Sequence, residues 1–183
     1  MIYDPTRHRR RSIRLAAYDY AQAGVYFVTI VCKDRALLLE EPSFRAVAEE
    51  AWHWLTNRYE FVQLDEYVVM PNHLHGIVII ADPCRGGSRT APTNGPKRKT
   101  LGRLVGAFKT VSTKRINEFR GTPGLPVWQR NYYERVVRDD DELTDIRQYI
   151  ADNPVRWAED RENPTNVGEP SIGAHGGASL RNV

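Results

Sequence analysis

The sequence predicts an α+β fold, a ferredoxin-like βαββαβ sandwich with an antiparallel sheet and one further helix appended at the C-terminal end. Three observations lead to this prediction. Four short segments are rich in β-branched and aromatic residues, and three longer segments repeat apolar residues at helical spacing. Their order along the chain is strand, helix, strand, strand, helix, strand, helix. The length of 183 residues suits one such domain with extensions.

The first half of the domain contains three strands and one helix. Residues 25–32, VYFVTIVC, follow a glycine and are predicted to form the first strand. Residues 43–59 place apolar side chains at helical spacing, and Ser43 is predicted to cap this helix. Residues 61–70 and 73–80 are predicted to form a hairpin, because the pair Pro71-Asn72 between them favours a turn.

The second half begins with residues 82–100, which are rich in Gly, Pro, Ser and Thr and lack periodicity, so a flexible loop is expected. Residues 101–119 are predicted to be helical and residues 127–138 to form the fourth strand, with Trp128, Tyr132 and Tyr133 packed in the core rather than stacked on a ligand. Residues 139–153 predict a helix with acidic residues in its first turn, which favours the helix dipole. The expected organisation is a basic N-terminal arm over 1–24, a domain over 25–159 and a disordered tail over 160–183.

Composition restricts the class of protein. The chain is 41% hydrophobic and 27% charged, and no apolar run approaches the roughly 18 residues that a membrane span needs. The basic N-terminus is not followed by the apolar region of a signal peptide, and Cys32 and Cys84 do not have the spacing of a metal site. A cytoplasmic protein without membrane association is therefore expected.

Two histidines in the hairpin form the first candidate site. His73 and His75 are two residues apart on a predicted strand, so their side chains project from the same face, where they could hold one metal ion. Such a pair also occurs by chance as two polar residues at the start of a strand. Tyr149 and Asn153 are four residues apart on the last helix and share one face. Taken singly, Tyr149 would be a core aromatic residue and Asn153 a helix cap, but together with the histidines they favour a site.

Three separate motifs carry a resemblance to a known family. MPNHLHGIV, GAFKTVSTKRIN and RDDDELTDIRQYIADNPVRW, in this order, resemble the single-tyrosine HUH transposases, and specifically the REP-associated tyrosine transposases, over residues 26–157. The resemblance implies that Tyr149 is the nucleophile and that His73, His75 and Asn153 bind Mg²⁺ or Mn²⁺. It also implies a metal-dependent endonuclease and strand transferase, with the appended helix as a catalytic helix. Single-stranded DNA at hairpin-forming, REP-like palindromic repeats would be cleaved and rejoined through a covalent 5′-phosphotyrosine intermediate.

Clustered basic residues are the candidates for binding the DNA, although the formal net charge is only +3. The arginines of the arm are expected to neutralise phosphates, and basic residues of helix 101–119 to follow a hairpin stem. A solvated charged surface is an equally good interpretation for any single lysine. The residues concerned are Arg7, Arg9, Arg10, Arg11 and Arg14 in the arm, and Arg103, Lys109, Lys114 and Arg115 in the helix.

Two other functions remain open from the sequence. The protein could be a sequence-specific binder of hairpin DNA with a domesticated host role and weak or absent catalysis. It could also be a metal-dependent hydrolase that uses the histidine pair without Tyr149. The sequence does not determine which DNA sequence is bound. It also leaves open whether the protein moves itself or processes host repeats, and whether it is a monomer or a homodimer.

Overall fold

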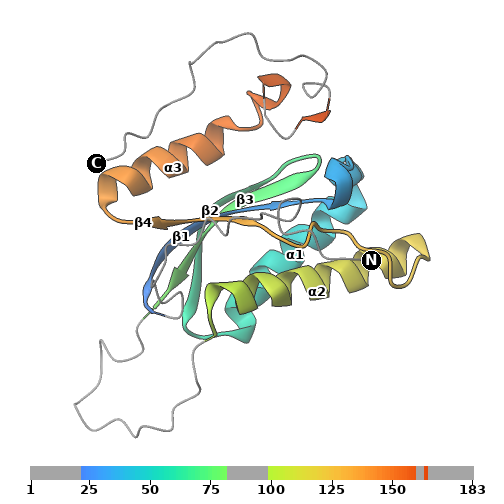
Figure 1. Ribbon diagram of the computed structural model, residues 1–183, viewed down its shortest axis with the longest axis horizontal. Helices are drawn as coiled ribbons and strands as arrows, with labels where there is room; N and C mark the ends of the chain where they lie inside the picture. Colours follow the sequence, from blue (N-terminus) through green and yellow to red (C-terminus); the bar gives the residue numbers. More distant parts are fainter. Residues whose placement is uncertain (1–21, 82–98, 160–162, 165–183) are drawn as a thin grey trace, which may run out of the picture.

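The structure, a computed structural model, describes residues 22–81, 99–159 and 163–164 (Figure 1). It confirms the predicted order of a βαββαβ unit followed by one further helix. The main elements are β1 (Gly24–Val31), α1 (Pro42–Arg58), β2 (Val62–Val69), β3 (His73–Ile80), α2 (Leu101–Arg120), β4 (Tyr133–Val137) and α3 (Asp140–Asp152). Short 3-10 turns are η1 (Lys33–Arg35), η2 (Leu38–Glu40) and η4 (Trp157–Glu159).

The four strands form one antiparallel sheet in the order β2-β3-β1-β4. Helices α1 and α2 cover one face of this sheet and α3 covers the opposite face (Figure 1). The two central strands are therefore buried on both sides, which explains why β3 reads HLHGIVII with almost no polar alternation. Because side chains alternate along a strand, each central strand supplies residues to both layers.

The larger core lies between the sheet and the helices α1 and α2. Trp52 of α1 and Phe108 of α2 are fully buried there, with their rings perpendicular and their centroids 5.4 Å apart. The strands contribute Tyr26, Val28, Ile30, Leu74, Val78 and Ile80 to this layer. Burial of these large apolar side chains is the main source of stability for the sandwich.

Helix α3 closes the smaller core, which contains Phe27, Ile77, Val137, Ile146 and Ile150. The helix starts with Asp139 as N-cap, whose carboxylate accepts a hydrogen bond from the Glu142 backbone N–H at 2.8 Å. Glu142 pairs with Arg135 of β4 at 2.5 Å, and Arg147 donates two hydrogen bonds of 2.8 and 2.6 Å to Asp65 of β2. These pairs hold α3 across the sheet, from β4 at one edge to β2 at the other.

The start of α1 and the length of β4 differ from the prediction. Helix α1 begins at Pro42 with Glu41 as its N-cap residue, and Ser43 lies in the first turn, where its hydroxyl donates to the Glu41 carboxylate at 3.0 Å. Proline is favoured at the first helical position, because the N–H that it lacks would have no acceptor within the helix there. The N-cap is therefore the residue before Pro42.

Strand β4 is shorter than the predicted 127–138. Before Tyr133, Trp128 forms an isolated bridge with Cys32. The Lys109 ammonium donates to the carbonyls of Gln129, Arg130 and Asn131 at 2.8, 3.4 and 3.0 Å, so a side chain takes the acceptors that a neighbouring strand would otherwise use. The core position of Trp128 is confirmed, Tyr132 packs against the core, and Tyr133 is 39% exposed.

Several predictions fall on residues outside the described ranges. Most of the N-terminal arm with its five arginines, nearly all of the loop over 82–100 and most of the tail from 160 belong to this group. Within the described residues, no helix combines the length and the hydropathy that crossing a bilayer would require.

Candidate active site

The predicted histidine pair lies at the start of β3, on the face covered by α3. His73 and His75 are buried, and their Nε2 atoms are 3.0 Å apart. The other nitrogen of each ring is held from behind: Nδ1 of His73 lies 2.9 Å from Asn72 Oδ1, and Nδ1 of His75 lies 2.8 Å from Thr29 Oγ1. Both rings therefore direct Nε2 toward the same point.

The surroundings of His75 disfavour its protonated form. Burial first, and then the neighbouring His73, hold the pKa of the His75 imidazole well below its usual 6.5. Phe27 of β1 stacks on the His75 ring with the centroids 5.5 Å apart, which adds to the apolar surroundings. A neutral imidazole keeps a free lone pair, which is the form that binds metal ions.

The spacing of the pair fits a divalent cation. Two nitrogens in adjacent positions of an octahedral site, each about 2.1 Å from the ion, lie about 3.0 Å apart, and the two Nε2 atoms have this separation. Among the described residues no three His, Cys, Asp or Glu side chains come together as a metal site. A third ligand from this part of the chain would therefore be of another type, such as an amide oxygen.

Asn153, the predicted third ligand, follows the end of α3 and is buried. Its side-chain nitrogen donates to the Tyr149 carbonyl at 3.4 Å. This bond uses the amide nitrogen, whereas a hard cation binds the amide oxygen. The donor chemistry of His73, His75 and Asn153 thus suits Mg²⁺ or Mn²⁺, with nitrogen ligands relatively more favourable to Mn²⁺.

Tyr149 projects from α3 toward the histidines. Its hydroxyl lies 3.3 Å from His75 Nε2, and its ring packs edge-on to Phe27 with the centroids 6.0 Å apart. The side chain is 48% exposed, so the hydroxyl lies at the boundary between the buried pair and solvent. The fold thus brings together His73, His75 and Tyr149, which come from distant parts of the sequence.

Sequence reasoning missed the residues that support the histidine rings. Thr29 lies opposite His75 in the register of β1 with β3, and that register depends on strand pairing rather than on a local pattern. Asn72 was noted only as part of a turn, although its position next to His73 was a usable signal. Trp157 of η4, with its ring 6.0 Å from that of His73, was not singled out.

The basic residues predicted on α2 lie in the opposite layer from Tyr149, and most of them have protein partners. Burial lowers the pKa of Lys109 to about 8, and its ammonium is used in the three carbonyl contacts described above. Arg115 pairs with Glu50 at 3.3 Å and Lys114 with Glu118 at 3.9 Å. Lys109 therefore supports residues 129–131, whereas the exposed Arg103 and Lys114 have the accessibility that a phosphate contact needs.

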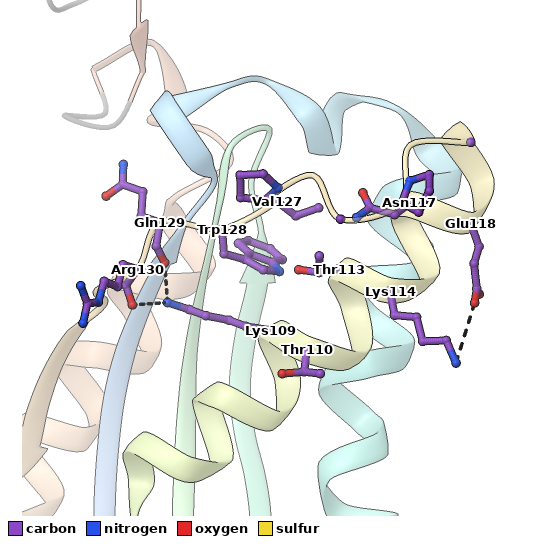
Figure 2. A pocket seen from close by; sticks show the side chains of 14 residues that line it. Lys109, Thr110, Thr113, Lys114, Asn117, Glu118, Val127, Trp128, Gln129 and Arg130 are labelled. Carbon is purple, nitrogen blue, oxygen red and sulfur yellow. Dashed lines mark hydrogen bonds and ion pairs between the residues drawn. The ribbon is translucent and has the colours of Figure 1, made fainter.

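A hollow of about 840 Å³ lies between the C-terminal half of α2 and residues 121–130 (Figure 2). Figure 2 shows Lys109 crossing toward the carbonyls of Gln129 and Arg130, and Lys114 turned toward Glu118. None of the residues that line it comes from β3 or α3. The hollow is therefore separate from the histidine pair.

The chain is similar in sequence to two proteins of Haemophilus influenzae. No family model matches the chain. An uncharacterized protein of Haemophilus influenzae is 33% identical over 174 residues, which cover 87% of this chain and 96% of that protein. A second Haemophilus influenzae protein, named "Putative REP-associated tyrosine transposase", is 26% identical over 142 residues, 75% of this chain and 74% of its own length.

A solved structure has the same fold. A REP-associated tyrosine transposase bound to a REP hairpin superposes with a TM-score of 0.56 and 18% identity, over 80% of this chain and 74% of that one. At this identity the likeness establishes a shared architecture. The two central features of the candidate site, the histidine pair and Tyr149, lie within that architecture on one face of the sheet.

Proposed function

We propose that this chain, which is 26% identical to a protein named as a putative REP-associated tyrosine transposase and shares the fold of a solved one, cleaves and rejoins single-stranded DNA with Tyr149 as nucleophile. The observation that carries the proposal is the position of the Tyr149 hydroxyl, 3.3 Å from Nε2 of a buried histidine whose partner Nε2 is 3.0 Å away. A hydrolase that uses the histidine pair alone would have no need for a tyrosine at this position.

The reaction begins with attack of Tyr149 Oη on the scissile phosphorus. The O–P bond to tyrosine forms, the bond between phosphorus and the 3′ oxygen breaks, and that oxygen takes up a proton to become a free 3′ hydroxyl. The phenolic proton passes to water, to which the half-exposed side chain has access. The 5′-phosphotyrosine conserves the energy of the phosphodiester, so attack by a second 3′ hydroxyl restores the tyrosine and joins different ends.

The histidine pair and Asn153 have a separate task. When Mg²⁺ or Mn²⁺ is bound by His73, His75 and Asn153, the cation neutralises charge that develops on the phosphoryl oxygens. The protein's contribution is to bury both imidazoles and to orient them through the hydrogen bonds with Thr29 and Asn72. Without such orientation the rings would lose part of their affinity for a cation.

The substrate proposed is DNA that contains a hairpin, as in REP-like palindromic repeats. The superposed transposase is bound to a REP hairpin, and this supports the same class of substrate here. The arginines of the N-terminal arm, with Arg103 and Lys114 of α2, are proposed to contact phosphates. Since α2 and α3 cover opposite faces of the sheet, DNA that reaches both would have to pass around an edge of the sheet.

The proposal is tested by Tyr149→Phe, which removes one oxygen. The variant is expected to fold and to bind a hairpin oligonucleotide like the parent chain, but to lose both cleavage and the covalent adduct. A DNA strand labelled at its 3′ end reports both, since the fragment that carries the 5′ phosphate migrates with the protein on a denaturing gel.

Tyr133→Phe is the matched control, because Tyr133 is also partly exposed and edge-on to Phe27 but belongs to β4. This control is expected to cleave normally, and an excess of chelator is expected to suppress cleavage by the parent chain. Undiminished cleavage by the Tyr149 variant would exclude the covalent mechanism. Tight hairpin binding by the parent chain without cleavage under any metal would instead favour a binding protein.

A further inference from the structure

We propose that Asn72 and Thr29 are positioning residues that control the tautomers of the histidine pair in two different ways. Asn72 accepts from Nδ1 of His73 and so leaves the lone pair of the neutral ring on Nε2, whereas the Thr29 hydroxyl allows His75 to exchange between its two neutral tautomers. The role of the two histidines in cation binding is part of the proposed function, so this inference rests on that function and deepens it. It is argued from hydrogen-bond chemistry in the metal-free chain and is testable without DNA.

The first step concerns the orientation of the Asn72 carboxamide. Its Nδ2 lies 3.2 Å from the backbone carbonyl of Arg35, and a carbonyl can only accept, so the nitrogen of the amide must face it. The oxygen Oδ1 then faces His73 Nδ1 at 2.9 Å. A carboxamide oxygen also only accepts, so Nδ1 of His73 carries the hydrogen. In the neutral ring, which is the form that binds a cation, this N–H is the only one and the lone pair is on Nε2.

Backbone hydrogen bonds around Asn72 keep its amide from flipping. Asn72 is fully buried, and its own carbonyl accepts from the Cys32 backbone N–H at 2.7 Å. The preceding Pro71 carbonyl accepts from Leu39 N–H at 2.8 Å, so the turn before β3 is bonded to both ends of the segment that contains η1. Arg35, in that segment, has a φ of 57°, which is uncommon for a residue with a side chain. The surrounding bonds therefore determine where the Arg35 carbonyl lies.

The third step concerns His75. With the lone pair of His73 on Nε2 and no cation between the rings, the 3.0 Å contact between the two Nε2 atoms is a hydrogen bond when His75 Nε2 carries the hydrogen. The Tyr149 hydroxyl, 3.3 Å away, can then accept from the same N–H. Nδ1 of His75 must then accept from the Thr29 hydroxyl, 2.8 Å away. A cation bound by both Nε2 atoms requires the opposite tautomer, with the hydrogen on Nδ1. A hydroxyl can donate or accept by rotation about its C–O bond, so Thr29 satisfies both states.

Nuclear magnetic resonance of the full chain tests the tautomers directly. Long-range ¹H–¹⁵N correlations of the metal-free protein are expected to show His73 with hydrogen on Nδ1 and His75 with hydrogen on Nε2. Saturating Mg²⁺ is expected to leave His73 unchanged and to move the His75 hydrogen to Nδ1. Hydrogen on Nε2 of His73 in the metal-free protein, or a His75 that does not respond to the ion, would overturn the proposal.

Binding of Mn²⁺, followed by electron paramagnetic resonance, separates positioning from simple packing. Thr29→Val keeps the shape but removes the hydroxyl, and it is expected to weaken Mn²⁺ affinity by about 10- to 100-fold. Thr29→Ser restores a hydroxyl and is expected to recover most of that loss, and Asn72→Leu is expected to lose a similar factor. Equal affinity of the valine and serine variants, or absence of Mn²⁺ binding by the parent chain, counts against the proposal.

Circular dichroism of each variant monitors folding, and the tautomers of the unmodified chain decide the matter if a variant fails to fold. None of these measurements involves DNA or cleavage. Failure of the transposase proposal would therefore appear in the gel assay with Tyr149→Phe, whereas failure of this inference would appear in the tautomers and in metal binding.

Discussion

Replacing Gly76 with alanine is expected to destabilise the protein, even though alanine is normally the better residue inside a strand. Gly76 lies in β3 next to His75, and a Cβ built on it would be 2.6 Å from Cζ2 and 3.1 Å from Cε2 of Trp52. The indole cannot easily move away, because Trp52 is fully buried and Phe108 packs against it with the ring centroids 5.4 Å apart. The new methyl group must therefore displace the core or the strand.

Two opposing effects set the size of the change. Overpacking of a well-packed core costs about 1 to 3 kcal/mol, whereas replacing glycine in a strand gains about 0.5 to 1 kcal/mol from reduced chain entropy. The difference of these ranges is a net loss of about 0 to 2.5 kcal/mol in the free energy of unfolding for Gly76→Ala, and the 2.6 Å approach to Trp52 favours the upper part of that range.

Gly106→Ala is the matched control for this substitution. Gly106 lies in α2, and its added Cβ would meet nothing within 4 Å, so only the propensity effect applies. A gain of about 0.5 to 1 kcal/mol is expected. Urea denaturation followed by circular dichroism measures both variants under the same conditions. A Gly76→Ala protein that is as stable as the parent, or more stable, would refute the close approach of Trp52 to β3.

Two further predictions concern charged side chains. Lys109→Met is expected to lower the free energy of unfolding by about 1 to 3 kcal/mol, because the backbone carbonyls of residues 129–131 lose their donor. Thermal unfolding measures this change. An unchanged midpoint would mean that water replaces the ammonium as the donor. The hydrogen bonds from Arg147 lower the pKa of Asp65 from its usual 3.8, so the pair stabilises the fold above about pH 4 and this contribution is lost as the pH falls through the folded-state pKa. Asp65→Asn should therefore flatten the loss of stability below about pH 4 in urea titrations, and identical pH profiles for the two proteins would contradict the assignment.

Patterns local to the sequence predicted the order of the elements and grouped the candidate side chains of the site. A period of two residues placed His73 and His75 on one face of a strand, and a spacing of four placed Tyr149 and Asn153 on one face of a helix. Both groupings are present in the structure, where Tyr149 also meets His75. The resemblance of three motifs to one transposase family agrees with the comparisons.

Tertiary structure decided which groups meet across the chain. The register of β1 against β3 puts Thr29 behind His75, and the loop after β1 presents the Arg35 carbonyl to Asn72. Neither contact follows from periodicity, because register and hydrogen-bond partners depend on segments far apart in sequence. The same reason explains Lys109, whose sequence context predicted a solvent-exposed cation for DNA, whereas the packing of α2 beside residues 129–131 turned it into a backbone donor. The sequence by itself therefore determined which side chains are available for chemistry, while the fold decided which of them are held, which are exposed and which serve only the structure.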